Sequence, residues 1–168
     1  MDAPSSLQAG AEVAGFRVVA KWREGSMAVL YRVADADGGE HLLKLPRLGF
    51  GSHPACYAGF EAEQAILERL AGPHVPRLRA SGDGDGGPYL VIDRVAGSSL
   101  ADIAAAAPLP AAEVARLGAA LAFALHDLHR QNVVHHDLKP SHVILRPDGT
   151  AVLIDFGLAR HGDLPDLV

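Results

Sequence analysis

Residues 135–157, HHDLKPSHVILRPDGTAVLIDFG, are the stretch that best indicates the fold and chemistry of this chain. A carboxylate at Asp137 precedes Lys139 by two positions, and a second carboxylate follows at Asp155. Transfer of a phosphoryl group requires a positioned hydroxyl, an acceptor for its proton, and cations that neutralise the phosphate charge. Two carboxylates and a lysine at this spacing meet those needs, so the stretch predicts a site for phosphoryl transfer.

The same stretch resembles the catalytic loop of protein kinases, His-Arg-Asp-Leu-Lys-Pro-x-Asn, followed by their Asp-Phe-Gly metal motif. The resemblance implies that Asp137 orients the acceptor hydroxyl as a base, that Lys139 contacts the transferred phosphate, and that Asp155 binds Mg²⁺. Lys139 followed by Pro140 is typical of Ser/Thr kinases. The chain is therefore similar to bacterial Hanks-type Ser/Thr protein kinases, which implies ATP and Mg²⁺ as cofactors and a protein substrate with a Ser or Thr acceptor.

Taken alone, the His-His-Asp cluster also fits a metal-hydrolase site or a polar loop that closes a helix, because short motifs match by chance. The context favours the kinase interpretation. Apolar runs at 143–146 and 151–154 predict a hairpin between the two motifs. A stripe of apolar residues at helical spacing predicts a long helix before them. This stripe consists of Val114, Leu117, Leu121, Leu125 and Leu128.

The part of the chain before this helix predicts a sheet with one helix. Between Phe16 and Pro46 apolar runs alternate with turn clusters, which predicts three antiparallel strands. A helical pattern follows and ends at Gly72-Pro73. Residues 78–80 and 89–95 predict two further strands, which are separated by a glycine-rich loop.

These elements predict an α+β, protein-kinase-like two-lobed fold. Its N-lobe would hold a five-stranded antiparallel sheet and one helix, and its helical C-lobe would be incomplete. The expected divisions are a polar leader at 1–12, the N-lobe at 13–95 and a partial C-lobe at 96–168. Residues 96–99 are the expected hinge between the lobes.

A lysine on the third strand, Lys44, has apolar neighbours on both sides, where an ammonium group is costly to bury without a counter-ion. Glu63 falls on the same helical stripe as Phe60, Leu67 and Leu70, so its carboxylate should point inward. The kinase resemblance predicts that Lys44 pairs with Glu63 and contacts the ATP phosphates. The alternative is that both side chains reach solvent.

Two further segments resemble nucleotide-binding parts of kinases. Residues 22–31 resemble the phosphate loop, in which Gly25 is the one glycine retained and Met27 precedes the position of the last glycine. Arg23 and Ala28 at the other two glycine positions should stiffen the loop. Residues 89–95 resemble the strand and hinge that bind adenine, with Ile92 as gatekeeper and the hinge running from Asp93 to Val95.

Three features depart from the kinase pattern. His142 replaces the asparagine that holds a metal ion, and imidazole suits softer ions than Mg²⁺, so Mg²⁺ should support less activity and Mn²⁺ more. His136 replaces the arginine that usually receives an activation-loop phosphate. The chain ends at Val168 before any Ala-Pro-Glu motif, which predicts either a fragment or a short relative. Apolar faces left exposed on the long helix would favour self-association.

The composition excludes several classes of partner. The 168 residues carry a formal charge of −5 with a pI near 5.9, so nucleic acid and anionic membrane are not attracted in general. No apolar run is long enough to cross a membrane. The single cysteine, Cys56, excludes an internal disulfide and a thiolate zinc cluster, and predicts a cytoplasmic location.

Two other functions remain open at this point. A small-molecule phosphotransferase of the aminoglycoside or choline kinase type shares the aspartate loop and the metal aspartate, but usually lacks the Lys-Pro of Lys139-Pro140. An ATP-binding pseudokinase or regulatory module is favoured by His142 and the glycine-poor phosphate loop. Lys44, Asp137 and Asp155 favour an active enzyme.

Overall fold

A computed structural model describes residues 7–25, 27–47, 54–84 and 87–165 of the chain. Its contacts divide the chain into two compact units, neither of them continuous in sequence. Unit 1 comprises Met1–Phe60 and Leu78–Arg94, and unit 2 comprises Glu61–Arg77 and Val95–Val168. The predicted lobes at 13–95 and 96–168 are each continuous in sequence, unlike these units, and they stay a proposal. Residues 1–6 of the expected leader lie outside the described part.

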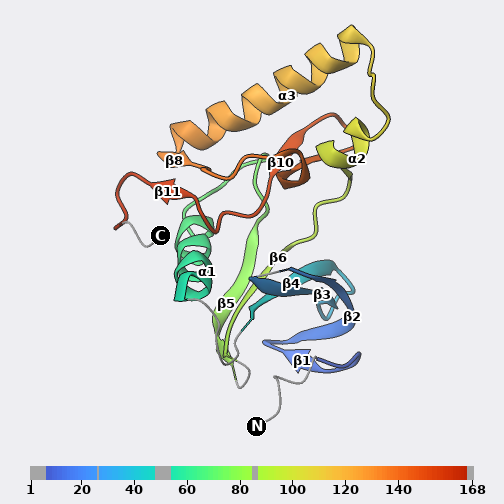
Figure 1. Ribbon diagram of the computed structural model, residues 1–168. Coiled ribbons are helices and arrows are strands. Elements are labelled where there is room, and N and C mark those ends of the chain that lie inside the picture. Colours follow the sequence, from blue (N-terminus) through green and yellow to red (C-terminus); the bar gives the residue numbers. More distant parts are fainter. Residues whose placement is uncertain (1–6, 26, 48–53, 85–86, 166–168) are drawn as a thin grey trace. The chain divides into compact units, whose positions relative to one another are not determined.

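Unit 1 is built on an antiparallel sheet with the strand order β1-β2-β3-β4-β6-β5. Figure 1 shows these strands from blue to light green. The bounds are β1 Glu12–Val13, β2 Phe16–Glu24, β3 Ala28–Ala34, β4 Glu40–Pro46, β5 Leu78–Gly84 and β6 Gly87–Asp93.

All five predicted strands are present, but the predicted number is wrong by one because β1 adds a sixth. Its two residues pair with the start of β2 across Ala14 and Gly15, whose φ values are 53° and 82°. Two successive residues at positive φ form the tight hairpin turn that suits strand twist. A two-residue strand is too short to show an alternating pattern in the sequence.

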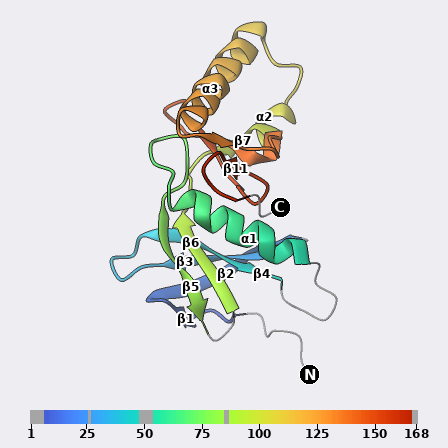
Figure 2. The same cartoon turned by 90° about the vertical axis from the view of Figure 1, so that its left-hand side faces the viewer.

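The core of unit 1 lies on one face of this sheet. A buried cluster consists of Val18, Tyr31, Val33, Leu43 and Val91, which come from four adjacent strands. β5, Leu78–Gly84, continues four residues past its predicted end, and β6, Gly87–Asp93, begins two residues before its predicted start. Both strands therefore extend into the glycine-rich segment (Figure 2). β6 also ends at Asp93, two residues before the predicted end at Val95.

Helix α1, Pro54–Leu67, is divided between the two units. It ends at Leu67, before the Gly72-Pro73 that was expected to end it. The segment after it belongs to unit 2 because its polar groups bond there. Ala71 N donates to Gln131 Oε1 at 2.9 Å, and Gln131 Nε2 donates back to Ala71 O at 3.0 Å. The amide of Leu153 donates to His74 O at 2.8 Å.

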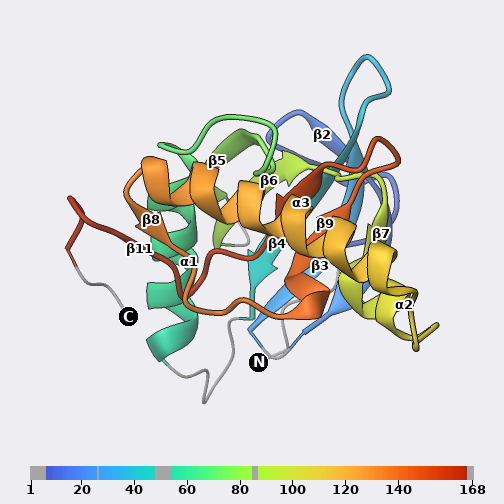
Figure 3. The ribbon, with the colours of Figure 1, turned by 90° about the horizontal axis from the view of Figure 1, so that it is seen from above.

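The rest of unit 2 consists of helices and short strands. Two small antiparallel sheets have the orders β10-β9-β7 and β11-β8. In Figure 3, β8 lies at the end of the long helix α3. The bounds are β7 Ser98–Ser99, α2 Leu100–Ala104, α3 Ala111–Arg130, β8 Val133–Val134, the 3-10 helix η1 Pro140–His142, β9 Val143–Leu145, β10 Ala151–Leu153 and β11 Arg160–His161. The predicted hairpin between the two motifs is β9–β10.

The expected hinge at 96–99 lies wholly within unit 2, and its role as a hinge stays a prediction. Ser98 and Ser99 form β7 and pair with β9, and the Ser99 hydroxyl accepts a hydrogen bond from the amide of Asp102 at the start of α2. Gly97 has a φ of 141°, and a Cβ there would lie 2.2 Å from Leu145 O. Close packing of backbone on backbone therefore fixes this segment.

The predicted apolar stripe of α3 is only partly covered. Leu128 is buried and Leu117, Leu121 and Leu125 are half-buried, whereas Val114 is 54% exposed. Phe123 is 69% exposed. Val114 and Phe123 are nine positions apart, which places them on opposite sides of a helix, so they form no single patch. Among the helices of the described residues, none is long and apolar enough to cross a membrane.

Candidate active site

The loop between β8 and η1 is held by His135, which is buried beside the Asp-Phe-Gly segment. Its Nε2 donates to Ile154 O at 3.0 Å, and its Nδ1 lies 3.3 Å from the amide of Asp137, which donates to it. Burial is the largest cause that lowers the pKa of His135, which favours this neutral form. The ring also packs on Phe156, with centroids 5.1 Å apart. The sequence motif includes His135, but its pattern did not predict that this ring holds the catalytic loop against the Asp-Phe-Gly segment.

Asp137 and Lys139 are brought together within this loop. Lys139 Nζ donates to Asp137 Oδ2 at 2.9 Å, and both side chains are partly exposed. The amide of Asp137 also donates to His135 O at 2.8 Å. A carboxylate that is fixed by its backbone and open to solvent can accept a proton from an incoming hydroxyl. The adjacent ammonium group adds positive charge at the same point.

His142 connects the two carboxylates that the sequence singled out. Its side chain is buried, with the residue 8% exposed. Nδ1 lies 3.0 Å from Asp137 O, to which it can donate, and 3.4 Å from Asp137 Oδ2. Nε2 lies 3.3 Å from Asp155 Oδ2. The amide of Ile154 donates to His142 O at 3.0 Å, so backbone and side chain both join the two motifs.

Asp155 has a φ of 66°, a left-handed conformation that is uncommon for a residue other than glycine. It lies between the half-buried Ile154 and the fully buried Phe156. Such conformations cost energy and persist where neighbouring contacts enforce them. The hydrogen bonds of Ile154 and the packing of Phe156 supply those contacts, and the carboxylate remains partly exposed.

The donor atoms fit a divalent cation, but they fit Mg²⁺ incompletely. Asp155 offers the carboxylate oxygen that Mg²⁺ prefers, and substrate phosphates commonly complete a Mg²⁺ site in phosphoryl-transfer enzymes. His142 offers a nitrogen, which suits softer ions. Within the described ranges, no group of three or more His, Cys, Asp and Glu side chains is placed to hold a metal by itself. A metal there would depend on ligands from a bound nucleotide.

Lys44 and Glu63 belong to different units, and their predicted pair stays a prediction. Lys44 is half-buried on β4, between the ladder partners Leu30 and Leu90. Glu63 is only 2% exposed, which confirms that its carboxylate points away from solvent. A buried carboxylate requires a polar or charged partner.

The predicted phosphate loop is a tight connection from β2 to β3. The amide of Gly25 donates to Ala28 O at 2.9 Å, and Arg47 Nη1 donates to Gly25 O at 3.2 Å. Gly25 is not in the left-handed region, and a Cβ there would meet only Ala28 O at 3.4 Å. Met27 is exposed, and its carbonyl accepts from the amide of Arg47. Ser26 lies outside the described residues.

The three predicted adenine-site residues lie in different surroundings. Ile92 is buried in β6, opposite Leu42 of β4 and Leu78 of β5. Asp93 ends β6 and is half-buried. Val95 begins the segment Val95–Val168 of unit 2 and is also half-buried.

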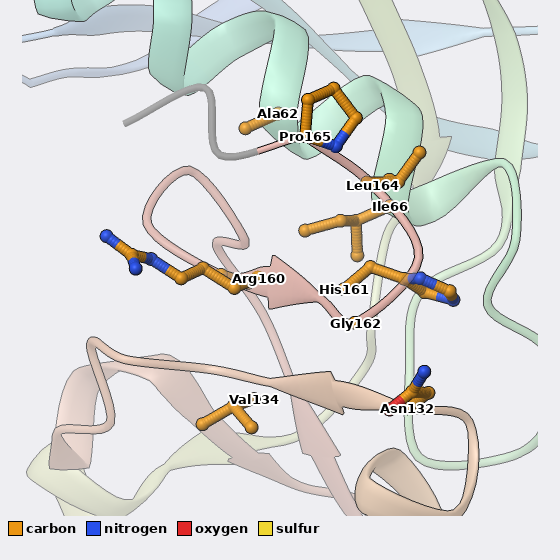
Figure 4. Close-up of a pocket in the computed structure, with 10 residues that line it drawn as sticks. Ala62, Ile66, Asn132, Val134, Arg160, His161, Gly162, Leu164 and Pro165 are labelled. Carbon is orange, nitrogen blue, oxygen red and sulfur yellow. The ribbon is translucent and has the colours of Figure 1, made fainter.

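Unit 2 also contains a cavity of about 270 Å³ (Figure 4). Its walls include Ala62 and Ile66 of α1, Val134 of β8, and His161 of β11. None of the predicted site residues lines this cavity. The cavity is therefore separate from the groups that would transfer a phosphoryl group.

Comparison with known proteins agrees with this arrangement. The protein kinase domain model matches residues 24–166. The chain is 28% identical over 148 residues to the probable serine/threonine-protein kinase PknB of Lactococcus lactis, and 30% identical over 145 residues to the kinase AfsK of Streptomyces coelicolor. Both alignments cover 86% of this chain, but only 24% and 18% of the relatives.

Two solved structures are similar in fold to this chain. The PknI kinase domain of Mycobacterium tuberculosis is similar with a TM-score of 0.71 and 28% identity, over 95% of this chain and 66% of that one. The apo form of PpkA-294 has a TM-score of 0.75 over 90% of this chain and 62% of its own, and at 21% identity it supports the fold alone.

The chain belongs to the protein kinase family. Within that family, the predicted resemblance to bacterial Hanks-type Ser/Thr kinases and the predicted α+β kinase-like fold are confirmed. The chain spans less than two thirds of the relatives' length, so its activity and partners are proposals.

Proposed function

We propose that this chain is the nucleotide-binding and catalytic-loop part of an ATP-dependent protein serine/threonine kinase. The observation that supports this most is that one buried imidazole contacts both Asp137 and Asp155, while Lys139 bonds to Asp137. Lys139 Nζ lies 2.9 Å from Asp137 Oδ2, and His142 reaches Asp137 and Asp155 with its two ring nitrogens. A base, a cation and a metal-binding carboxylate are the groups that phosphoryl transfer requires.

In this proposal Asp137 orients the Ser or Thr hydroxyl of a protein substrate and accepts its proton as the new oxygen–phosphorus bond forms. Lys139 stabilises the charge on the transferred group. ATP, bound with a divalent cation, supplies the phosphoryl group and leaves as ADP. Asp155 is the carboxylate that holds the cation, and Gly25, Met27, Lys44, Glu63, Ile92, Asp93 and Val95 are the proposed nucleotide-binding residues.

The nature of the cation follows from His142. Mg²⁺ is the usual cation of protein kinases, and the Asp155 carboxylate suits it. The imidazole nitrogen 3.3 Å from that carboxylate suits a softer divalent ion. We therefore propose that Mg²⁺ supports weak activity in this chain and that Mn²⁺ supports more.

A pseudokinase is the second candidate, because His142 occupies a metal position and the phosphate loop retains one glycine. A small-molecule phosphotransferase has less support, since Lys139-Pro140 is typical of protein kinases. The proposed location is cytoplasmic, on the basis of the single cysteine. Self-association through α3 also has less support, because its exposed Val114 and Phe123 lie on opposite sides of the helix.

The test is transfer of labelled γ-phosphate from ATP to a generic Ser/Thr protein acceptor, with Mg²⁺ or Mn²⁺, alongside a measurement of nucleotide binding. Asp137→Asn should lower transfer at least about 100-fold and leave nucleotide binding intact. Binding without transfer would identify a pseudokinase. Transfer to an aminoglycoside or choline but not to protein would identify a phosphotransferase, and absence of nucleotide binding would contradict all three functions.

A further inference from the structure

A buried histidine of unit 1, His41, lies beside the last residue of β6. His41 is the second residue of β4 and lies directly opposite Asp93, the last residue of β6. It is 5% exposed, and its ring makes an edge contact with Phe16 at a centroid distance of 5.4 Å. Nε2 donates to Asp35 Oδ2 at 2.8 Å. Nδ1 lies 3.3 Å from Asp93 Oδ1, a close contact that is not a hydrogen bond.

The two carboxylates around His41 are themselves held in place. Arg79 of β5 donates from Nε to Asp93 Oδ1 and from Nη2 to Asp93 Oδ2 at 3.1 Å. Asp35, in the turn after β3, accepts from the amides of Gly39 at 2.7 Å and Asp37 at 3.0 Å. The hydrogen bond from His41 is the largest cause that lowers the pKa of Asp35. We call Asp35, His41, Arg79 and Asp93 the His41 network.

This network is located where the regular pairing of β4 with β6 ends. The ladder runs from Lys44 opposite Leu90 to His41 opposite Asp93, and no pair of this ladder follows. The backbone that follows Asp93 is therefore not held by this ladder. The side chains of His41 and Arg79 supply contacts to Asp93 from the strands on both sides.

A second set of charged groups lies at the same place on the opposite face of the sheet, since successive residues of a strand point to opposite faces. Arg94 Nη1 lies 2.6 Å from Glu40 Oε2, and Arg32 Nη2 lies 3.3 Å from Glu40 Oε1. All three of these side chains are at least 40% exposed. Exposed ion pairs contribute little because water screens them. Glu40 therefore provides a control that is adjacent to His41 in sequence.

We propose that His41 is a positioning residue that holds the backbone of Asp93 in the geometry required to bind adenine. The inference rests on the proposed ATP-binding function, in which Asp93 begins the hinge. Backbone groups that recognise a base must be held to within about 0.5 Å, and they depend on supporting contacts for this. His41 is buried and makes no contact with the base itself; it acts through Asp93.

The test is calorimetric titration of the 168-residue chain with adenosine and, separately, with ATP. His41→Leu should weaken the binding of both ligands by the same factor of about ten, because the defect is at the adenine end. His41→Gln keeps one N–H donor and should recover part of the affinity. Glu40→Gln should bind both ligands as the unchanged chain does. If His41→Leu does not fold, His41→Gln is measured instead. It should weaken the binding of adenosine and of ATP by one common factor that is smaller than ten.

Val18→Ala separates positioning from general loss of stability. Val18 is fully buried on β2, which is not adjacent to β4, so its truncation should lower the Tm at least as much as the His41 variants do. Unchanged adenosine affinity in Val18→Ala, with weakened affinity in His41→Leu, supports the proposal. Equal losses in both variants would overturn it, as would a loss in His41→Leu confined to ATP or no loss at all. If the unchanged chain binds neither ligand, the proposed kinase function itself fails.

Discussion

The Nε2 atom of His142 lies 3.3 Å from Oδ2 of Asp155. Two ligands of one metal ion, each about 2.1 Å from it, are separated by about 3.0–3.4 Å, depending on whether the geometry is octahedral or tetrahedral. The two atoms are therefore already spaced as a nitrogen–oxygen pair that could share one cation. By the resemblance to kinases, we expect this pair to stand where an asparagine and an aspartate would offer oxygen atoms alone.

The first prediction concerns this pair. His142→Asn restores an oxygen donor, so Mg²⁺-supported phosphoryl transfer should rise about tenfold and the Mn²⁺ to Mg²⁺ activity ratio should fall. Electron paramagnetic resonance of bound Mn²⁺ in the presence of ADP should show weaker Mn²⁺ binding in the variant. An unchanged metal ratio together with unchanged Mn²⁺ binding would show that His142 does not select the metal.

A second prediction concerns Gly25 in the phosphate loop. Its φ is outside the left-handed region, and an added Cβ would make only an ordinary 3.4 Å contact with Ala28 O. Gly25→Ala should therefore leave the Tm nearly unchanged but weaken ATP binding several-fold, roughly 3–10-fold, because the Cβ blocks close approach of phosphate. Adenosine, which has no phosphate, should bind as before. Weaker adenosine binding would place the effect outside the phosphate loop.

A third prediction compares two glycines of unit 2. Gly97→Ala places a Cβ 2.2 Å from Leu145 O at a φ of 141°, so unfolding in urea should show a loss of more than about 2 kcal/mol. Gly118 lies within α3 with open space around it, and Gly118→Ala should add about 0.5–1 kcal/mol. Equal effects of the two substitutions would contradict the close contact between Gly97 and β9.

The fourth prediction concerns acid stability and His135. Burial lowers the pKa of His135 in the folded chain below the ordinary value of 6.5. The unfolded chain therefore binds the proton more readily, and the contribution of His135 to stability is complete above about pH 6.5 and is lost as the pH falls through the lowered folded pKa.

His135→Gln keeps a donor for Ile154 O but cannot titrate. We expect it to be less stable than the unchanged chain near neutral pH by about 1–2 kcal/mol, and the difference to shrink as the pH falls toward about 5. Urea unfolding at several pH values measures this. His126→Gln, at an exposed position within α3 and away from its last turn, is the control. A pH-independent difference for His135→Gln would show that the ring does not titrate in this range.

Much of the architecture could be predicted because it depends on local patterns. The alternating strands, the helix that carries Glu63, the long helix before the catalytic loop and the hairpin between the motifs all follow from periodicity and turn residues. The inward orientation of Glu63 also follows from its position on a helical stripe. Element ends were less accurate, since α1 ends at Leu67 and β6 ends at Asp93.

The amino-acid sequence by itself determined the family and the chemical groups in the stretch 135–157: Asp137, Lys139 and Asp155, with histidines at 136 and 142. Only the tertiary structure decided what connects them. Contacts such as His142 with Asp155, His135 with Ile154, and His41 with Asp93 join residues that are far apart in the chain. Such contacts depend on strand register and side-chain packing, which the period of a local pattern does not encode. The sequence therefore names the reactive groups, and the packing of buried histidines determines how they are held.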